Sequence, residues 1–431
     1  MARSERHPLA TRQLRAAWAL AFGLVGCGGP EPGPNPPPPP PVTIPITGQA
    51  VPALSAMDNA ISDLIRTWQI PGAAVAVTYQ ERLVYARGFG YADTLARRQV
   101  QPDALFRIAS VSKPITAVTV LRLVDEGKLA LDAKALDLIP DLMAPAGTTE
   151  DPRLGEITIR QLLWHVGGWD RDRSGDPVFQ NAQIALSLGV GRPASAEDVI
   201  RYMRGRPLDF DPGSRYVYSN FGYMVLGRII ERVTGQDYES YVRGSTLAAA
   251  GITRMQVGHS RATERTPGEV TYYDLNTGPS VYPDGGMVPA PDGAFYLESM
   301  DSHGGWIASA VDLVKFVTGV DGQDTRPDLI PSALFLPMLS APPGAIWTGA
   351  VHYGLGWLVR PDPGNWWHNG SLPGTASFVA RYANGVTVAA VFNARAMTPS
   401  SAFESQVDPT LGNALGAVSS WPAHDLFSQF P

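Results

Sequence analysis

The sequence predicts an α/β protein in which a mostly helical lobe interrupts an α/β lobe. Two observations indicate this class. A pair of apolar segments typical of a β-hairpin lies near each end of the folded region, and the long stretch between them reads as short helices and Gly/Pro-rich loops. The chain has 431 residues, of which 44% are hydrophobic, so it can bury a large core.

The first elements of the α/β lobe follow one another closely. Residues 56–69 read as an amphipathic helix that Pro71-Gly72 ends, and 73–79 and 82–89 read as the two strands of a hairpin. Residues 110–127 then read as a helix with apolar side chains at helical spacing, namely Ile115, Val118, Leu121 and Val124.

The later part of the folded region is predicted to contain a helix, a loop-rich segment and then two more strands. Residues 223–234 form a predicted helix closed by Gly235, whereas 260–300 are loop-rich and difficult to place. Near the end, 376–382 and 386–392 are predicted strands joined at Asn384-Gly385, a strong hairpin signal.

The N-terminus has the pattern of an export signal. Four arginines precede an apolar run, residues 16–25, that is too short to span a bilayer. The run ends in Leu24-Val25-Gly26-Cys27, which resembles a bacterial lipobox, and Cys27 is the only cysteine. We expect a cell-envelope lipoprotein anchored through Cys27; the alternative is an ordinary signal peptide with an incidental cysteine.

The predicted organisation has three parts: a signal peptide over 1–26, a proline-rich linker over 27–50 and a folded domain over 51–431. Residues 28–50 hold ten of the 39 prolines, which is typical of a stiff spacer. Within the folded domain we expect an α/β lobe formed by about 51–125 and 300–431, and a helical lobe over about 126–299.

The charge balance argues against nucleic acid as a partner. The formal net charge is −6, and residues 1–26 carry +3 from four arginines and one glutamate, which leaves −9 for the remainder. An acidic body of this kind does not attract phosphate backbones. No segment after the signal is long and apolar enough to be a transmembrane helix.

The sequence Ser110-Val111-Ser112-Lys113 carries the main chemical signal. Residues at i and i+3 lie on one face of a helix, so an amine stands beside a hydroxyl that it can deprotonate. Of the 34 lysines and arginines only four are lysines, and only Lys113 has a serine three residues before it. Arginine cannot act as a base, whereas lysine can. Alone, the motif also fits a helix cap beside a surface lysine.

Two further motifs are consistent with a hydrolytic site. Tyr218-Ser219-Asn220 precedes the helix at 223–234; a phenol near an ammonium can have a lowered pKa, and an amide can orient Lys113. His368-Asn369-Gly370-Ser371 leads towards a predicted strand, and Gly370 would allow a ligand to approach the backbone closely. Each has a structural alternative, a loop and helix cap for the first and a core histidine for the second.

Taken in order, the three motifs resemble those of class C β-lactamases and their relatives: penicillin-binding proteins, D-aminopeptidases and family VIII carboxylesterases. The resemblance covers nearly all of 51–420 and extends to Pro71-Gly72-Ala73, Leu162-Leu163-Trp164-His165 and Gly304-Gly305-Trp306. It implies a β-lactamase/transpeptidase-like fold with a central antiparallel sheet flanked by helices.

The resemblance also implies roles. Ser110 would be the acylated nucleophile, Lys113 the base or proton relay, Tyr218 the catalytic phenol and Asn220 the orienting amide. The backbone N–H groups of Ser110 and Ser371 would form the oxyanion hole, in which one donor is worth about 3–4 kcal/mol. The resemblance implies no cofactor and no metal.

One departure bears on the substrate. The third motif of β-lactamases is usually Lys-Thr-Gly, and here a mostly neutral imidazole, His368, replaces the ammonium. This favours small acyl esters over D-amino-acid peptides, with β-lactams third. We expect a monomer that acts on a small ester or peptide; a non-catalytic envelope protein that binds cell-wall fragments is the alternative from another class.

Three competing signals are weaker. Gly258-His259-Ser260-Arg261-Ala262 imitates the α/β-hydrolase elbow but lacks its last glycine and the apolar helix that should follow. His165, His303, His352 and His368 are scattered and form no metal motif. Among the tryptophans near the motifs we expect only Trp306 or Trp367 to touch substrate.

Overall fold

The computed structural model describes residues 43–430 except 324, 348 and 396–399. The predicted signal, Cys27 and most of the linker lie outside the described residues. Residues Ile44–Pro431 form one compact unit, so the proposed lobe boundaries near 126 and 300 remain a prediction. None of the helices in the described part of the chain combines the length and apolar character needed to span a bilayer.

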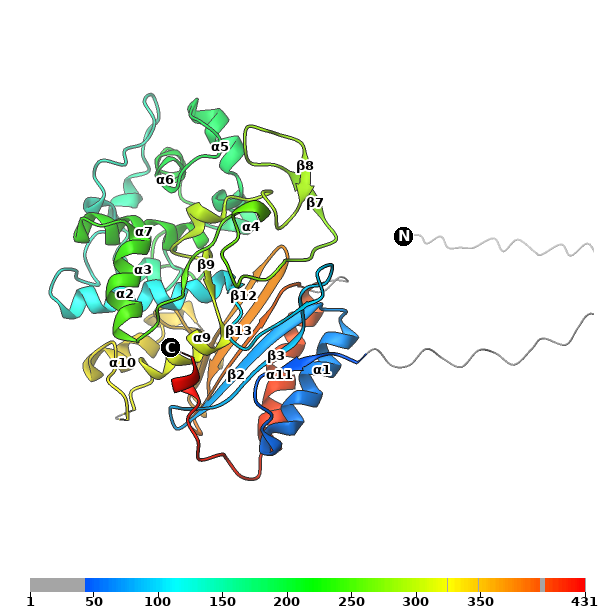
Figure 1. The fold of residues 1–431 in the computed structure, drawn as a ribbon. Coiled ribbons are helices and arrows are strands. Elements are labelled where there is room, and N and C mark those ends of the chain that lie inside the picture. Colours follow the sequence, from blue (N-terminus) through cyan, green and yellow to red (C-terminus); the bar gives the residue numbers. More distant parts are fainter. Residues whose placement is uncertain (1–42, 324, 348, 396–399, 431) are drawn as a thin grey trace, which may run out of the picture. The chain divides into compact units, whose positions relative to one another are not determined.

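An antiparallel sheet forms the centre of this unit (Figure 1). Its strands come from both ends of the described chain, and β2 pairs with β14 across more than 300 positions of sequence, for example Val77 with Val388. The strand order in the sheet is β1 (Ile46–Thr47), β3 (Arg82–Asp93), β2 (Gly72–Tyr79), β14 (Val386–Phe392), β13 (Thr375–Arg381), β12 (Asn365–Leu372), β11 (Leu358–Arg360) and β10 (His352–Tyr353), with β4 (Arg98–Gln99) on β3.

The antiparallel sheet and both predicted hairpins are confirmed. The turn of the first hairpin, Gln80-Glu81, has positive φ at both residues, and the second turns at Asn384-Gly385. The prediction that 27–50 contains only linker was wrong at its end. Ile46 and Thr47 pair with Phe89 and Gly88, so the sheet begins before residue 51.

Helices cover both faces of the sheet. In Figure 1, α1 and α11 lie side by side on one face, and α9 lies on the other. Alternate residues of β2 therefore enter different apolar clusters: Ala73, Val75 and Val77 pack on the α1 side, whereas Ala74 and Ala76 pack on the α9 side. Burial on both faces explains the continuous apolar runs of these strands.

The region between the two groups of sheet strands is mostly helices and loops, as predicted. Its small sheets are β5 (Phe106–Arg107) with β9 (Trp306–Ala308) and β6 (Gln256–Val257), and β7 (Thr277–Pro279) with β8 (Met287–Pro289). The helices of the described chain are α1 (Ser55–Thr67), α2 (Ser112–Asp125), α3 (Ile159–Leu163), α4 (Arg171–Ser174), α5 (Asn181–Leu188), α6 (Ala196–Arg204), α7 (Asn220–Thr234), α8 (Tyr238–Val242), α9 (Ala310–Thr318), α10 (Ser332–Leu339) and α11 (Ser400–Gly416).

Candidate active site

Ser110 lies in a short 3-10 turn, Ala109–Val111, that leads directly into α2. The helix itself begins at Ser112, two residues later than the sequence predicted. The turn is held from behind by β13, because the hydroxyls of Thr375 and Ser377 donate to the carbonyl oxygens of Arg107 and Ile108. These bonds fix the backbone that carries the serine.

Lys113 is completely buried and reaches the serine as predicted. Its Nζ lies 3.3 Å from Ser110 Oγ, 2.7 Å from Asn220 Oδ1 and 2.9 Å from the carbonyl oxygen of His303. The last two atoms only accept hydrogen bonds. A neutral amine would use its two hydrogens there and direct its lone pair to the Ser110 hydroxyl. Burial holds the pKa of Lys113 well below its usual value, which favours this neutral form.

Asn220 is the first residue of α7, and Ser219 caps that helix by accepting from the Gly222 N–H. The Asn220 Nδ2 donates to Asp176 Oδ2 at 2.7 Å, which turns Oδ1 towards Lys113. Asp176 itself caps the 3-10 turn Pro177–Phe179, and burial raises its pKa. No sequence motif pointed to Asp176; it is found only through the contact with Asn220.

Tyr218 precedes α7 and packs beside Lys113, whose Nζ lies 4.7 Å from the centre of the phenol ring. The expectation of a lowered pKa was wrong. Burial raises the pKa of Tyr218, and the nearby Ser110 hydroxyl offsets only part of the rise. The Tyr218 hydroxyl has no hydrogen-bond partner among the described residues, so at neutral pH it is a protonated phenol with a free O–H.

His165 holds the backbone on both sides of Tyr218. Its carbonyl oxygen accepts from Val217 N–H at 3.0 Å, and its Nδ1 accepts from Ser219 N–H at 3.1 Å. The residue adopts a left-handed conformation with φ of 60°, which allows both contacts. Its ring packs 4.3 Å from the Tyr218 ring, and burial lowers the pKa of His165 far below its usual value. The imidazole is therefore a neutral support.

The third motif lies within β12 rather than before a strand. His368 Nδ1 lies 2.7 Å from the carbonyl oxygen of Asn369, which can only accept, so Nδ1 carries the proton and Nε2 accepts from the Tyr353 hydroxyl at 2.9 Å. Burial is the main cause that lowers the pKa of His368 to about 3. The ring is neutral, and both of its nitrogens are engaged.

Gly370 brings β12 against the turn that carries Ser110. A Cβ at this position would fall inside van der Waals contact of the Ile108 carbonyl oxygen and the Ser377 hydroxyl. The glycine thus serves a close approach by the chain's own backbone, which corrects the expectation that a ligand uses this space. The approach brings Ser371 to the same cavity as Ser110.

A cavity of about 360 Å³ opens onto these groups. It is lined by Ser110, Arg171, Tyr216, Tyr218, Tyr353, Leu358, His368, Asn369, Ser371 and Glu404. Neither tryptophan expected to touch substrate lines it. Trp306 is fully buried and donates to the Tyr238 hydroxyl, and Trp367 packs against the apolar cluster on the α1 side of the sheet. No residue of 260–300 is among those that line the cavity.

The competing serine is structural. Ser260 is completely buried, and its hydroxyl donates to Glu298 while accepting from the Leu297 N–H. In the same segment His259, Glu264 and Glu298 place ligand atoms within 4.8 Å of one another. The sequence did not single out this group. Glu298 accepts from the Ser260 N–H and hydroxyl and lies 3.6 Å from His259 Nδ1, so contacts within the chain already hold these two members together.

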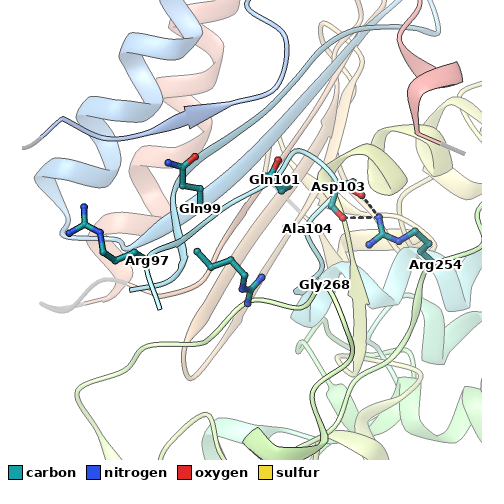
Figure 2. A pocket seen from close by; sticks show the side chains of 8 residues that line it. Arg97, Gln99, Gln101, Asp103, Ala104, Arg254 and Gly268 are labelled. Atoms are coloured by element: carbon teal, nitrogen blue, oxygen red, sulfur yellow. Dashed lines mark hydrogen bonds and ion pairs between the residues drawn. The ribbon is translucent and has the colours of Figure 1, made fainter. Parts of the chain in front are cut away.

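A second hollow, of about 450 Å³, shares no lining residue with the cavity at Ser110. Figure 2 shows the side chains that line it. Two of its arginines are engaged: Arg254 pairs with Asp103 at 2.6 Å, and Arg98 donates to the carbonyl oxygen of Glu269. Its lining residues are Arg97, Arg98, Gln99, Gln101, Asp103, Ala104, Arg254 and Gly268. The hollow contains no nucleophile.

Comparison with known proteins agrees with this geometry. The family model described as Beta-lactamase matches residues 57–408. Esterase EstB of Burkholderia gladioli is 33% identical over 55% of this chain and 59% of its own length. Penicillin-binding protein 4* of Bacillus subtilis is 26% identical over 70% of this chain and 63% of its own length. The chain thus spans about three fifths of the length of these relatives.

Solved structures share the fold. A D-amino acid amidase from Ochrobactrum anthropi SV3 superposes with a TM-score of 0.64 at 21% identity, over 85% of this chain and 99% of the other. The octameric penicillin-binding protein homologue from Pyrococcus abyssi superposes with a TM-score of 0.64 at 23% identity, over 86% of this chain and 79% of the other. Because the family model covers most of the chain, and a buried lysine lies beside a cavity serine, this protein belongs to the beta-lactamase family.

Proposed function

We propose that the chain is an esterase that hydrolyses small acyl esters through an acyl-enzyme at Ser110. The observation that carries this proposal is the set of contacts made by Lys113 Nζ. Two of them are to carbonyl oxygens that can only accept hydrogen bonds, so the lone pair of a neutral amine is left for the Ser110 hydroxyl. The neutral His368 supports an ester over substrates that need an ammonium in the third motif. The 33% identity to an esterase is further support.

Acylation would begin with Ser110 Oγ attacking the ester carbonyl while its proton passes to Lys113 Nζ. The backbone N–H groups of Ser110 and Ser371 would hold the oxyanion of the tetrahedral intermediate. Collapse of the intermediate breaks the bond to the alcohol oxygen, which needs a proton. The free O–H of Tyr218 would supply it and regain a proton from the Lys113 ammonium.

Deacylation reverses these roles. A water molecule takes the place of the alcohol and gives its proton through Tyr218 to Lys113, and the hydroxide attacks the acyl carbonyl. The second tetrahedral intermediate collapses to the carboxylic acid, and Ser110 Oγ takes back the proton from Lys113. Lysine, rather than tyrosine, is the base in this scheme because burial lowers the pKa of Lys113 and raises that of Tyr218.

The proposal is tested by comparing hydrolysis of p-nitrophenyl butyrate and a chromogenic cephalosporin, with Ser110→Ala and Ser260→Ala as paired variants. Fast ester turnover that is lost in Ser110→Ala and kept in Ser260→Ala supports the esterase. Faster cephalosporin turnover would make the protein a β-lactamase instead. A folded protein that neither turns over these substrates nor reacts with a fluorophosphonate would favour the non-catalytic binding role.

A second candidate activity is hydrolysis of D-amino-acid peptides or amides. Its support is the match to a penicillin-binding protein and the shared fold with a D-amino acid amidase. The cavity also holds Glu404, a carboxylate that could meet a substrate ammonium. Turnover of a D-alanine amide that exceeds turnover of the butyrate ester would place this activity first.

We further propose an exported lipoprotein that acts as a monomer in the bacterial cell envelope. The support is the lipobox-like Leu24-Val25-Gly26-Cys27 and the single cysteine. Cys27→Ala should block lipidation and move the protein out of the membrane fraction. An unchanged membrane fraction would count against the anchor, and a sedimentation equilibrium above one chain mass would count against the monomer.

A further inference from the structure

Arg171 is a cation in the catalytic cavity to which the reaction scheme gives no role. It is the first residue of α4, and its side chain is exposed and lines the cavity with Ser110. The guanidinium carbon lies 5.0 Å from the centre of the Tyr218 ring. Contact with a ring face leaves the N–H groups at the edge of a guanidinium available to a ligand.

The neighbouring arginines differ from Arg171 because they have protein partners. Arg173 donates to the Asp209 carbonyl oxygen at 3.1 Å, and Arg215 pairs with Asp170 at 2.8 Å. For the Arg171 guanidinium, the described residues provide no hydrogen bond and no ion pair. The positive charge of Arg171 partly offsets the rise in the pKa of Asp176 that burial causes. Asp176, however, accepts its hydrogen bond from Asn220 and not from Arg171.

No other group lining the cavity can supply a permanent positive charge. Lys113 is buried, and its Nζ already makes three polar contacts within the protein. His368 is neutral, and both of its ring nitrogens are hydrogen-bonded. The other charged lining residue is Glu404, which carries the opposite sign. An anionic ligand that enters this cavity therefore finds one attractive partner, Arg171, and is repelled by Glu404.

We propose that Arg171 binds a carboxylate carried by the substrate, so that the preferred esters are anionic. This inference rests on the proposed esterase function and specifies its substrate class. A guanidinium pairs with a carboxylate through two parallel N–H···O bonds, which fixes the orientation of the substrate as well as adding affinity. The carboxylate can belong to the acyl chain or to the alcohol, and the chemistry at Arg171 is the same for both.

The test uses the full chain and three esters: neutral p-nitrophenyl butyrate, the p-nitrophenyl monoester of glutaric acid, and a nitrophenyl butyrate with a carboxylate on its ring. The readout is the ratio of kcat/KM for each charged ester to that for the neutral one. Arg171→Gln should lower one of these ratios about tenfold or more, the scale of a lost charged hydrogen bond. Arg171→Lys should restore part of it, and Arg173→Gln should leave it unchanged.

The ester whose ratio falls shows which side of the substrate carries the carboxylate. In the unmodified protein the same ratio should also fall as sodium chloride is raised, because a partly exposed ion pair is screened. This second measurement does not depend on a variant folding. If the ratios change with neither the substitution nor the salt concentration, Arg171 does not bind a substrate carboxylate. The esterase proposal would still stand as long as hydrolysis of the butyrate ester depends on Ser110. If Ser110 were dispensable for all three esters, both proposals would be wrong.

Discussion

Asp176 fixes the orientation of Asn220. The Asn220 Nδ2 donates to Asp176 Oδ2 at 2.7 Å, and the opposite end of the same amide, Oδ1, accepts from Lys113 Nζ at 2.7 Å. A carboxylate only accepts hydrogen bonds, so it determines which end of the amide faces the lysine. Asp176 is thus a positioning residue for the proposed base, and its charge also reaches Lys113 and raises the pKa of the amine in part.

Asp176→Asn should move the acid limb of the pH profile of kcat/KM to lower pH. The active form of Lys113 is the neutral amine, so activity falls as the pH drops through the pKa of Lys113. Removing the negative charge lowers that pKa further, and the neutral amine persists to lower pH. The measurement is the profile for p-nitrophenyl butyrate, with Asp172→Asn in the preceding helix α4 as the control.

Asp176→Ala removes the orienting contact as well as the charge, and we expect kcat to fall about ten- to a hundredfold. A purely structural role would lower the amount of folded protein without moving the acid limb in Asp176→Asn. An unshifted limb in that variant would therefore contradict the proposed coupling between Asp176 and Lys113.

Tyr218→Phe should impair an alkyl ester far more than a nitrophenyl ester. An alkoxide needs a proton to leave, whereas a nitrophenolate is stable without one, so only the alkyl ester depends on the Tyr218 hydroxyl as an acid. Loss of general acid catalysis costs about a hundredfold or more. The comparison is kcat/KM for ethyl butyrate and p-nitrophenyl butyrate in both proteins, because kcat/KM reports acylation, whereas deacylation of the shared butyryl-enzyme uses Tyr218 for both esters. Equal losses on the two esters would mean that Tyr218 does not protonate the leaving group.

Gly370→Ala should destabilise the protein by about 1–3 kcal/mol, because the added methyl group overlaps the Ile108 carbonyl oxygen and the Ser377 hydroxyl. The shift would also separate Ser371 from Ser110 and lower kcat. Gly412→Ala in α11 is the matched control, since a Cβ there meets nothing within 4 Å. In a helix interior that change should stabilise by about 1 kcal/mol. If the urea midpoints of the two variants shifted in the same direction, the close approach at Gly370 would not be what requires a glycine there.

His368→Gln should make the stability less sensitive to acid. The folded-state pKa of His368 is lowered to about 3, so below its ordinary value near 6.5 the unfolded chain binds a proton that the folded chain does not. Stability is therefore full above about pH 6.5 and is lost as the pH falls. Between about pH 6.5 and pH 5 the unmodified protein should lose about 2 kcal/mol more than the variant.

Glutamine can keep the contacts of the neutral ring, because it can accept from Tyr353 and donate to the Asn369 carbonyl. His165 and His303 are also buried with lowered pKa values, and they add the same trend to both proteins. Denaturant titrations at the two pH values check the difference. Parallel losses in the two proteins would show that His368 does not titrate as described.

The local part of the site was readable from the sequence. The contact between Ser110 and Lys113 follows from helical spacing, and the neutrality of His368 follows from its residue type. The hairpins were readable because alternating apolar strands flank turn residues such as Asn384-Gly385. In each case the physical cause lies within a few positions of the chain.

Features that depend on packing were not readable. Burial raises the pKa of Tyr218, although its motif suggested the reverse, because desolvation is set by distant segments. Asp176 meets Asn220 across 44 positions. Trp306 looked like a pocket wall but lies entirely in the core. Arg171 resembles its neighbour Arg173 in sequence, and only the fold shows which of them lines the cavity.

Rapid acid quenching of the reaction with p-nitrophenyl butyrate, followed by intact mass spectrometry, would detect the acyl-enzyme at Ser110 itself. We expect a species heavier by one butyryl group, mapped by proteolysis to the peptide that contains Ser110, and its absence in Ser110→Ala. Turnover at the normal rate with no acylated species, or a label that persists in Ser110→Ala, would contradict the proposed acyl-enzyme.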